Sequence, residues 1–169
     1  MSDYLFDRAV PGNRNPAAGE TVNALFQDST ERFPDRPALS HKVHGAYEPI
    51  TYADLMTEVR ILASALINLG VQRGDRIAII GINSVQWVKA DLAVLAIGAV
   101  TVPVYPSLPA NQVAYALADC GAVLAFAGDA LQSAKLAKAR VVASSCRYIV
   151  AFEGEPDANT VPIEDLMTR

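Results

Sequence analysis

The side chains that could do chemistry are few, and their spacing does not combine them into a catalytic or metal-binding set. Cys120 and Cys146 form neither a CxxC pair nor a Cys/His cluster, so neither a metal site nor a disulfide framework is indicated. His41 and His44 lie in a segment expected to be extended, where side chains three residues apart point to opposite faces. Asp91 is a lone acid on an expected helix, typical of a solvated group. We therefore assign no catalytic, cofactor-binding or metal-binding residue from the sequence.

Signatures of phosphate binding, of hydrolases and of zinc proteases are also missing from the sequence. It contains no GxxxxGK[ST] loop, no GxSxG elbow and no HExxH pair. The turn after the first expected parallel strand, residues 81–86, has one glycine where a dinucleotide fingerprint needs three. The chain has four lysines, and none of them lies in such a motif: Lys42, Lys89, Lys135 and Lys138. A dinucleotide-binding or hydrolase function is therefore not indicated.

The composition of the 169-residue chain limits the class of protein. Hydrophobic residues make up 51% and charged residues 19%, with a net charge of −4, which excludes a disordered chain and argues against a nucleic-acid partner. The longest apolar run, residues 92–104, is shorter than the roughly 20 residues that span a bilayer, so it fits a buried core segment. No secretory signal is seen at the N-terminus, and we expect a cytoplasmic location, with peripheral membrane attachment left open.

The first fifty residues divide into an arm and the start of a folded domain. Prolines and glycines interrupt residues 1–20, which we expect to form an irregular N-terminal arm before a domain over residues 21–169. A helix is predicted over residues 22–33, because Thr21 is a good N-cap and a proline follows. Residues 38–43 and 47–50 are then predicted to form a hairpin around Gly45.

A strongly amphipathic helix is predicted after Thr51. Thr51 followed by Asp54 resembles a capping box, and Gly70 has the place of a glycine that ends a helix. Between them, large apolar residues recur at spacings of three and four, the period of one helix face: Leu55, Val59, Leu62, Leu66 and Leu69. Burial of this stripe is worth on the order of 7–15 kcal/mol before conformational entropy is counted, so the helix must pack on a sheet or another helix.

The rest of the chain alternates between short apolar strands and helices. Strands are predicted over residues 76–80, 100–105, 123–127 and 148–152. Helices are predicted between them, over residues 84–97, 109–120 and 130–139, the first capped by Asn83 or Ser84. The strands are nearly continuous apolar runs, as expected of strands that are covered on both faces. The pattern predicts an α/β fold with a doubly wound, mainly parallel sheet and covering helices.

Four segments, in order and at matching spacing, resemble the opening of the adenylate-forming (AMP-dependent synthetase and ligase) superfamily. They are residues 31–39 (ERFPDRPAL), 50–55 (ITYADL), 70–78 (GVQRGDRIA) and 95–106 (LAIGAVTVPVYP). The second and fourth resemble the first two core motifs of the superfamily. The resemblance covers residues 21–152 and implies the N-terminal subdomain of the adenylate-forming fold. Residues 83–87, 90–93 and 105–107 are most similar to long-chain fatty acyl-CoA synthetases.

The resemblance implies a ligase that works in two steps. A fatty-acid carboxylate attacks the α-phosphate of ATP bound with Mg²⁺, pyrophosphate leaves, and the thiol of coenzyme A (CoA) then opens the acyl-adenylate. The superfamily assigns this chemistry to a phosphate loop, an adenine-binding motif, a ribose-binding aspartate and a late lysine, and this sequence contains none of them. ATP, Mg²⁺, CoA and a fatty acid are therefore expected partners of the full-length enzyme, with no cofactor on this chain.

The sequence leaves three hypotheses open. The chain is the N-terminal fragment of a fatty acid–CoA ligase, inactive alone; or part of another adenylate-forming ligase, such as a fatty acyl-AMP ligase; or a self-contained, non-catalytic α/β binding or scaffold module. Residues 161–167 are predicted to begin an amphipathic helix in which the chain stops, and this favours a fragment. A sheet without its later strands is expected to expose an apolar edge or face and to self-associate, for example as a homodimer.

Overall fold

The computed structural model describes residues 21–153 and 160–168, so the arm predicted over residues 1–20 lies outside the described part. The helices are α1 Val22–Arg32, α2 Tyr52–Asn68, α3 Val85–Ala96, α4 Ala110–Cys120, α5 Ala130–Arg140 and α6 Ile163–Met167. The strands are β1 Pro37–Val43, β2 Ala46–Thr51, β3 Arg76–Ile80, β4 Val100–Val104, β5 Leu124–Ala127, β6 Tyr148–Ala151 and β7 Thr160–Pro162.

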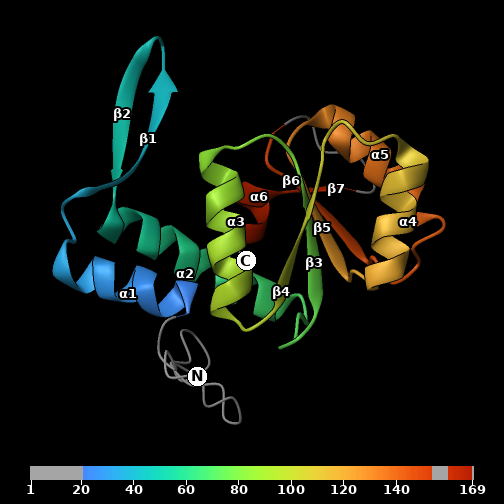
Figure 1. The fold of residues 1–169 in the computed structure, drawn as a ribbon, viewed down its shortest axis with the longest axis horizontal. Coiled ribbons are helices and arrows are strands. Elements are labelled where there is room, and N and C mark those ends of the chain that lie inside the picture. Colours follow the sequence, from blue (N-terminus) through green and yellow to red (C-terminus); the bar gives the residue numbers. More distant parts are fainter. Residues whose placement is uncertain (1–20, 154–159, 169) are drawn as a thin grey trace.

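Strands β3 to β7 form one sheet in the order β4-β3-β5-β6-β7, and every neighbouring pair is parallel. From β3 the chain passes through α3 to β4 on one side, and then crosses back through α4 to β5 on the other side (Figure 1). With β3 counted first, this is the 2-1-3-4-5 order of one common type of doubly wound fold. The predicted doubly wound, mainly parallel α/β sheet is confirmed.

Helices cover both faces of the sheet and divide the interior into two cores (Figure 1). Helices α2, α3 and α6 pack on one face, where Ile77 and Ile79 of β3 point. Helices α4 and α5 pack on the other face, where Ala78 and Ile80 point. Side chains of a strand alternate between faces, so one short strand contributes to both cores. The nearly continuous apolar pattern of β3 is therefore explained as predicted, by helices that cover both faces of the strand.

The two edge strands differ from the inner strands. Val100 of β4 is exposed and donates its main-chain N–H to the Asp75 oxygen at 2.8 Å, on the β3 side. Main-chain groups alternate sides along a strand, so the nitrogens of Thr101 and Pro103 face the open edge, and Pro103 has no N–H to offer there. At the other edge, β7 has three residues and ends on Pro162. Both edges are thus poor templates for a further strand.

Helix α2 begins and ends as predicted. The Thr51 hydroxyl accepts the N–H of Asp54 at 3.1 Å and donates to the Asp54 carboxylate at 2.6 Å, which is a variant of the capping box. At the other end, Gly70 has φ +84° and donates to the Ile67 oxygen at 2.9 Å, while Val71 donates to the Leu66 oxygen at 3.1 Å. This is a Schellman motif, in which a left-handed glycine closes the helix.

The prediction for residues 161–167 is wrong in its first part. The segment begins as strand β7, Thr160–Pro162, which pairs with β6 through Ile149 and its neighbours, and α6 starts only at Ile163. Pro162 fixes φ and is therefore compatible both with the end of an edge strand and with the position before a helix. Local pattern does not distinguish the two, and pairing with β6 decides for the strand.

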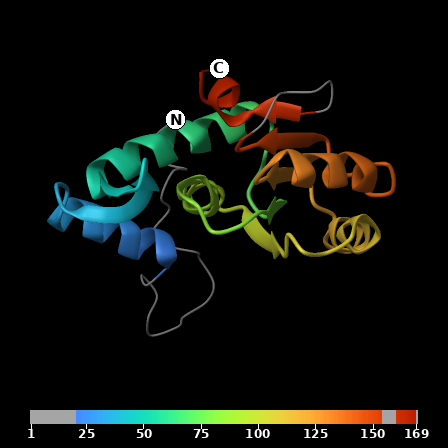
Figure 2. The same cartoon turned by 90° about the horizontal axis from the view of Figure 1, so that it is seen from above.

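Helix α1 and the β1–β2 hairpin lie at the end of the molecule opposite α4 and α5 (Figures 1 and 2). Helix α1 contacts α2 and α3, and Phe26 packs near Tyr52 with ring centroids 6.2 Å apart. The predicted hairpin is confirmed and turns at His44 and Gly45, which both have positive φ. It projects from the body of the molecule (Figure 1). Tyr47 on this hairpin is 75% exposed. The two-stranded ribbon thus presents most of its side chains to solvent.

Candidate functional site

The carboxyl edge of the sheet is the candidate functional site, because the connections that leave two neighbouring strands there go to opposite faces of the sheet. The loop after β3 leads to α3 on one face, and the loop after β5 leads to α5 on the opposite face. In open parallel sheets, ligands bind in the crevice where neighbouring strands send their connections to opposite faces. In this chain that crevice lies beyond the ends of β3 and β5, at Gly81 and Gly128.

Gly81 and Gly128 bring the two strand ends unusually close together. A Cβ atom on Gly128 would lie 2.8 Å from the Gly81 Cα, and one on Gly81 would lie 3.0 Å from the Gly128 Cα. The Gly128 N–H donates to the Ile80 oxygen at 2.8 Å, so the β3–β5 pairing continues into the loop. A side chain at either position would force the loops apart. The glycines therefore set the floor of the crevice.

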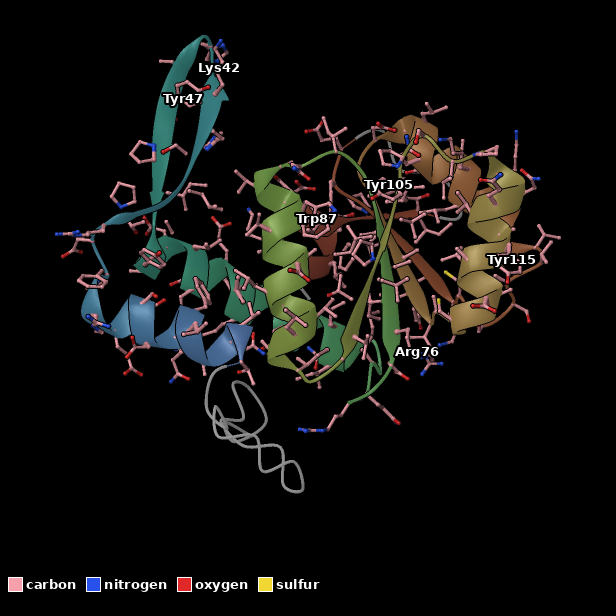
Figure 3. All side chains as sticks on the ribbon, viewed as in Figure 1. Lys42, Tyr47, Arg76, Trp87, Tyr105 and Tyr115 are labelled. Atoms are coloured by element: carbon pink, nitrogen blue, oxygen red, sulfur yellow. The ribbon has the colours of Figure 1, made fainter. Side chains whose placement is uncertain are left out.

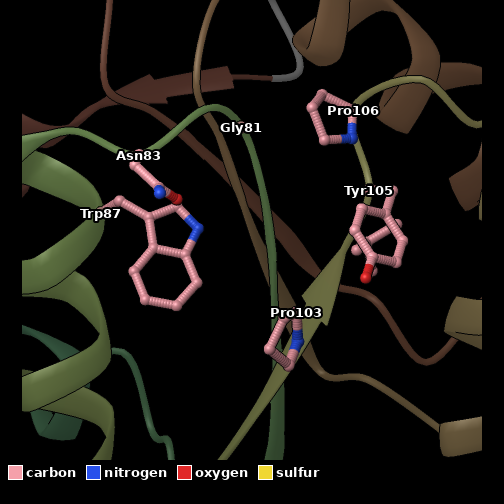
Figure 4. A pocket seen from close by; sticks show the side chains of 7 residues that line it. Gly81, Asn83, Trp87, Pro103, Tyr105 and Pro106 are labelled. Carbon is pink, nitrogen blue, oxygen red and sulfur yellow. The ribbon is translucent and has the colours of Figure 1, made fainter.

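A pocket of about 300 Å³ opens beside this point, between α3 and the loop that follows β4 (Figure 4). Seven residues line it: Gly81, Asn83, Trp87, Pro103, Val104, Tyr105 and Pro106. The Trp87 indole and the Tyr105 ring lie on opposite sides of it, with the Pro103 ring below (Figure 4). Its size is at the lower end of the range for small-molecule pockets.

The local sequence positions both aromatic side chains. Ser84 is the N-cap of α3, and its hydroxyl accepts a hydrogen bond from the main-chain N–H of Trp87 at 3.2 Å, which places Trp87 in the first turn beside the crevice. Tyr105 follows the last residue of β4 directly and is 77% exposed. Flat apolar rings with few charges suit a planar ring of a ligand, because aromatic faces stack on one another. The pocket thus offers flat apolar surfaces, and apart from the Tyr105 phenol none of its lining side chains is an acid, a base or a nucleophile.

Polar groups of α5 border the same edge of the sheet. Asp129 is the N-cap of α5 and accepts the Gln132 N–H at 2.8 Å. Gln132 is 3% exposed, and its Oε1 has no hydrogen-bond partner among the described residues. One turn further, the Lys135 ammonium donates to the Pro106 oxygen at 2.5 Å. A lysine of α5 thus reaches the loop that forms one wall of the pocket.

The reactive side chains considered from the sequence lie elsewhere. Cys120 ends α4 and Cys146 precedes β6, so both thiols are at the amino edge of the sheet, and both are free. Burial raises the pKa of the Cys146 thiol to about 11, which makes it unreactive at neutral pH. His41 and His44 belong to the projecting hairpin. Over the described ranges 21–153 and 160–168, no group of three or more His, Cys, Asp or Glu residues is placed to hold a metal ion.

The sequence analysis assigns no binding residue, so it does not identify Trp87 and Tyr105 as residues of a pocket. Both follow the carboxyl end of a predicted parallel strand, in segments already noted for their family resemblance. The rule that ligands bind beyond such ends was the available signal. Their juxtaposition could not be derived, because it depends on β3 and β4 being neighbours in the sheet.

The fold is that of an α/β protein with an open parallel sheet, the class in which ligand sites lie at the carboxyl edge. Residues 26–167 match the family of AMP-binding enzymes, and the chain belongs to this family. It is 35% identical over 119 residues to the long-chain-fatty-acid–CoA ligase FadD15 of Mycobacterium bovis, and the matched segment covers 70% of this chain and 20% of the ligase. It is 36% identical over 107 residues to the long-chain-fatty-acid–CoA ligase ACSBG2 of Rattus norvegicus, covering 63% and 16%.

A solved structure agrees with this assignment. Acetoacetyl-CoA synthetase from Streptomyces lividans superposes with a TM-score of 0.75 and 26% identity, over 85% of this chain and 24% of that enzyme. The chain thus spans about a fifth of the length of the curated ligases it matches. Among the helices of residues 21–153 and 160–168, none is long and apolar enough to cross a bilayer.

Proposed function

We propose that the chain is the N-terminal part of an ATP-dependent fatty acid–CoA ligase and is inactive alone. The observation that carries the proposal is the 35% identity over 119 residues to a long-chain-fatty-acid–CoA ligase, within a family match over residues 26–167. In this proposal ATP, Mg²⁺, CoA and a fatty acid serve the whole cytoplasmic enzyme, and residues 21–169 form one α/β unit of it after an arm at residues 1–20.

The proposed reaction has two steps, formation of an acyl-adenylate and transfer of the acyl group to CoA. A carboxylate oxygen of the fatty acid attacks the α-phosphorus of ATP, the bond from this phosphorus to the bridging oxygen breaks, and pyrophosphate leaves. The CoA sulfur then attacks the acyl carbon, the acyl–oxygen bond breaks, and AMP leaves with that oxygen. Such steps need charge neutralisation, in-line placement and exclusion of water. We assign none of these tasks to a side chain of this sequence.

The sequence lacks the adenine-binding motif of the family and gave the expectation that no cofactor binds this chain, but the pocket leads us to propose that its part is to bind the adenine ring of CoA. CoA carries an adenine ring, and the Trp87 and Tyr105 rings offer flat faces on either side of the pocket. Base–aromatic stacking contributes about 1–3 kcal/mol per base. Such a contact would hold the nucleotide without taking part in bond making, in agreement with a lining that, apart from the Tyr105 phenol, has no reactive side chain.

Trp87 provides the test, since it is the single tryptophan of the chain. We expect CoA and AMP to change its fluorescence and pantetheine, which lacks adenine, to leave it unchanged. Tyr105→Ser should weaken binding about fivefold or more if stacking is lost. Tyr115→Ser is the matched control, because Tyr115 is similarly exposed, at 71%, but lies on the outer side of α4 (Figure 3). Equal responses to pantetheine and to CoA would reject the adenine assignment.

A second experiment tests the reaction class. The full-length polypeptide should release AMP and pyrophosphate and form the CoA thioester from a long-chain fatty acid. Accumulation of acyl-adenylate with no thioester would identify a fatty acyl-AMP ligase instead. The 169-residue chain by itself should show no ATP–pyrophosphate exchange, and clear exchange would contradict its proposed inactivity.

A further inference from the structure

The loop between β4 and α4 forms one wall of the pocket but has little structure of its own. Pairing with β3 ends at Val104, and the next residue, Tyr105, is largely exposed. Pro106 has no N–H, and inside the loop the Leu108 N–H donates to the Tyr105 oxygen at 3.1 Å. One such turn does not fix a loop against the rest of a protein. The position of the wall therefore depends on contacts with other elements, and one of these is the packing of the Leu108 side chain against the core beneath α4 and α5.

Lys135 adds a polar contact to the packing of Leu108. Its ammonium donates to the Pro106 oxygen at 2.5 Å, across 29 residues of sequence and from the opposite side of the loop to the pocket-forming α3. A hydrogen bond from a charged donor is shorter and stronger than a neutral one, and this one is partly shielded from water. Lys135 is half-buried, so its stem is held between α5 and the loop.

The geometry points to Lys135 as a positioning residue for the pocket. Pro106 itself lines the pocket and Tyr105 precedes it, so a displacement of the Pro106 carbonyl moves two lining residues together. Lys135 does not line the pocket, and its effect on a ligand passes through the loop. This inference rests on the proposed function, because it takes the Trp87–Tyr105 pocket as the site that binds adenine.

Three variants test this role. Lys135→Met keeps the length of the stem and removes the donor, Lys135→Arg keeps a charged donor, and Lys138→Met removes an exposed lysine of the same helix. Two quantities are measured: hydrogen exchange at the Leu108 amide, which reports the order of the loop, and the CoA dissociation constant from Trp87 fluorescence. Thermal unfolding of each variant verifies that it is folded.

We expect Lys135→Met to speed exchange at Leu108 and to weaken CoA binding, each by about tenfold, because a charge-assisted hydrogen bond is lost. Lys135→Arg should stay close to the unchanged protein, and so should Lys138→Met. Unchanged exchange at Leu108 in Lys135→Met would overturn the inference, and so would an equal loss of CoA binding in Lys138→Met. If the unchanged protein binds no CoA, the adenine assignment fails, while faster exchange in Lys135→Met still shows that Lys135 holds the loop.

Discussion

Arg76 holds the carboxyl end of α4, and replacing it should cost more stability than its partly exposed position suggests. From the first residue of β3, its Nε donates to the Cys120 oxygen at 2.7 Å and its Nη2 to the Gly121 oxygen at 3.1 Å. Its Nη1 donates to the Gly74 oxygen at 3.1 Å. The guanidinium lies at the amino edge of the sheet, away from Tyr105 (Figure 3).

The expected magnitude follows from these contacts. Hydrogen bonds from a charged donor contribute about 1.5–3 kcal/mol each. The bond to Gly74 is exposed and is largely replaced by water, while the other two are partly buried. A cation at a helix carboxyl end adds about 0.3–1 kcal/mol. Because the two remaining bonds are only partly buried, water replaces part of each, and we count them at about half of that value. We therefore expect Arg76→Met to lower the free energy of unfolding by about 2–4 kcal/mol, which in urea moves the midpoint down by about 1–2 M.

Urea unfolding followed by circular dichroism measures the effect, with Arg76→Lys as the comparison variant. Lysine keeps the charge but not the fork that reaches several carbonyls at once, so it should restore less than half of the loss. Gly121→Ala provides a second check: with φ +63°, its Cβ would lie 2.9 Å from the Arg76 Nη2, so its cost should shrink when Arg76 is already replaced. A loss below about 0.5 kcal/mol for Arg76→Met, or full rescue by lysine, would refute the reasoning.

Two other predictions concern the glycine contact and the buried thiol. Gly128→Ala should destabilise the protein by about 1–3 kcal/mol in urea unfolding, because its Cβ would meet the Gly81 backbone at 2.8 Å, and a neutral result would show that the strand ends can separate freely. Burial raises the pKa of the Cys146 thiol from 9.0 to about 11, so the unfolded chain loses this proton first and stability should fall as pH rises from about 9 to 11. Cys146→Ala should flatten that part of the profile, and an unchanged slope would contradict the assignment.

The sequence predicted the helices and strands better than it predicted which of them lie next to one another. The stripe that includes Leu55 and Leu62 predicted α2, and both residues are buried at 2% and 0% exposure. Local spacing and capping chemistry suffice for such a helix, since its signals lie within a few residues of one another. Strand β7 was missed because three residues ending on Pro162 carry no alternation, and only pairing with β6 makes them a strand.

The pocket shows the same limit at the level of function. Trp87 and Tyr105 are brought together by the order of strands, which no local pattern encodes. Lys135 and Pro106 come together because α5 packs beside α4. Family resemblance, in contrast, depended on several short motifs in register, and the family assignment is confirmed by the match over residues 26–167. Expectations about self-association and about an isolated, inactive fragment remain predictions.

Pro103 in β4 also bears on the risk of aggregation while the protein folds. Parallel sheets form slowly, since each strand pair must wait for a crossover helix, and during that time a bare edge can capture another chain. At Pro103 the outer edge of β4 has a gap in its row of donors, so an intruding strand could not form a continuous ladder there. We therefore expect Pro103 to lower the tendency of β4 to pair with another chain before the helices have packed on the sheet.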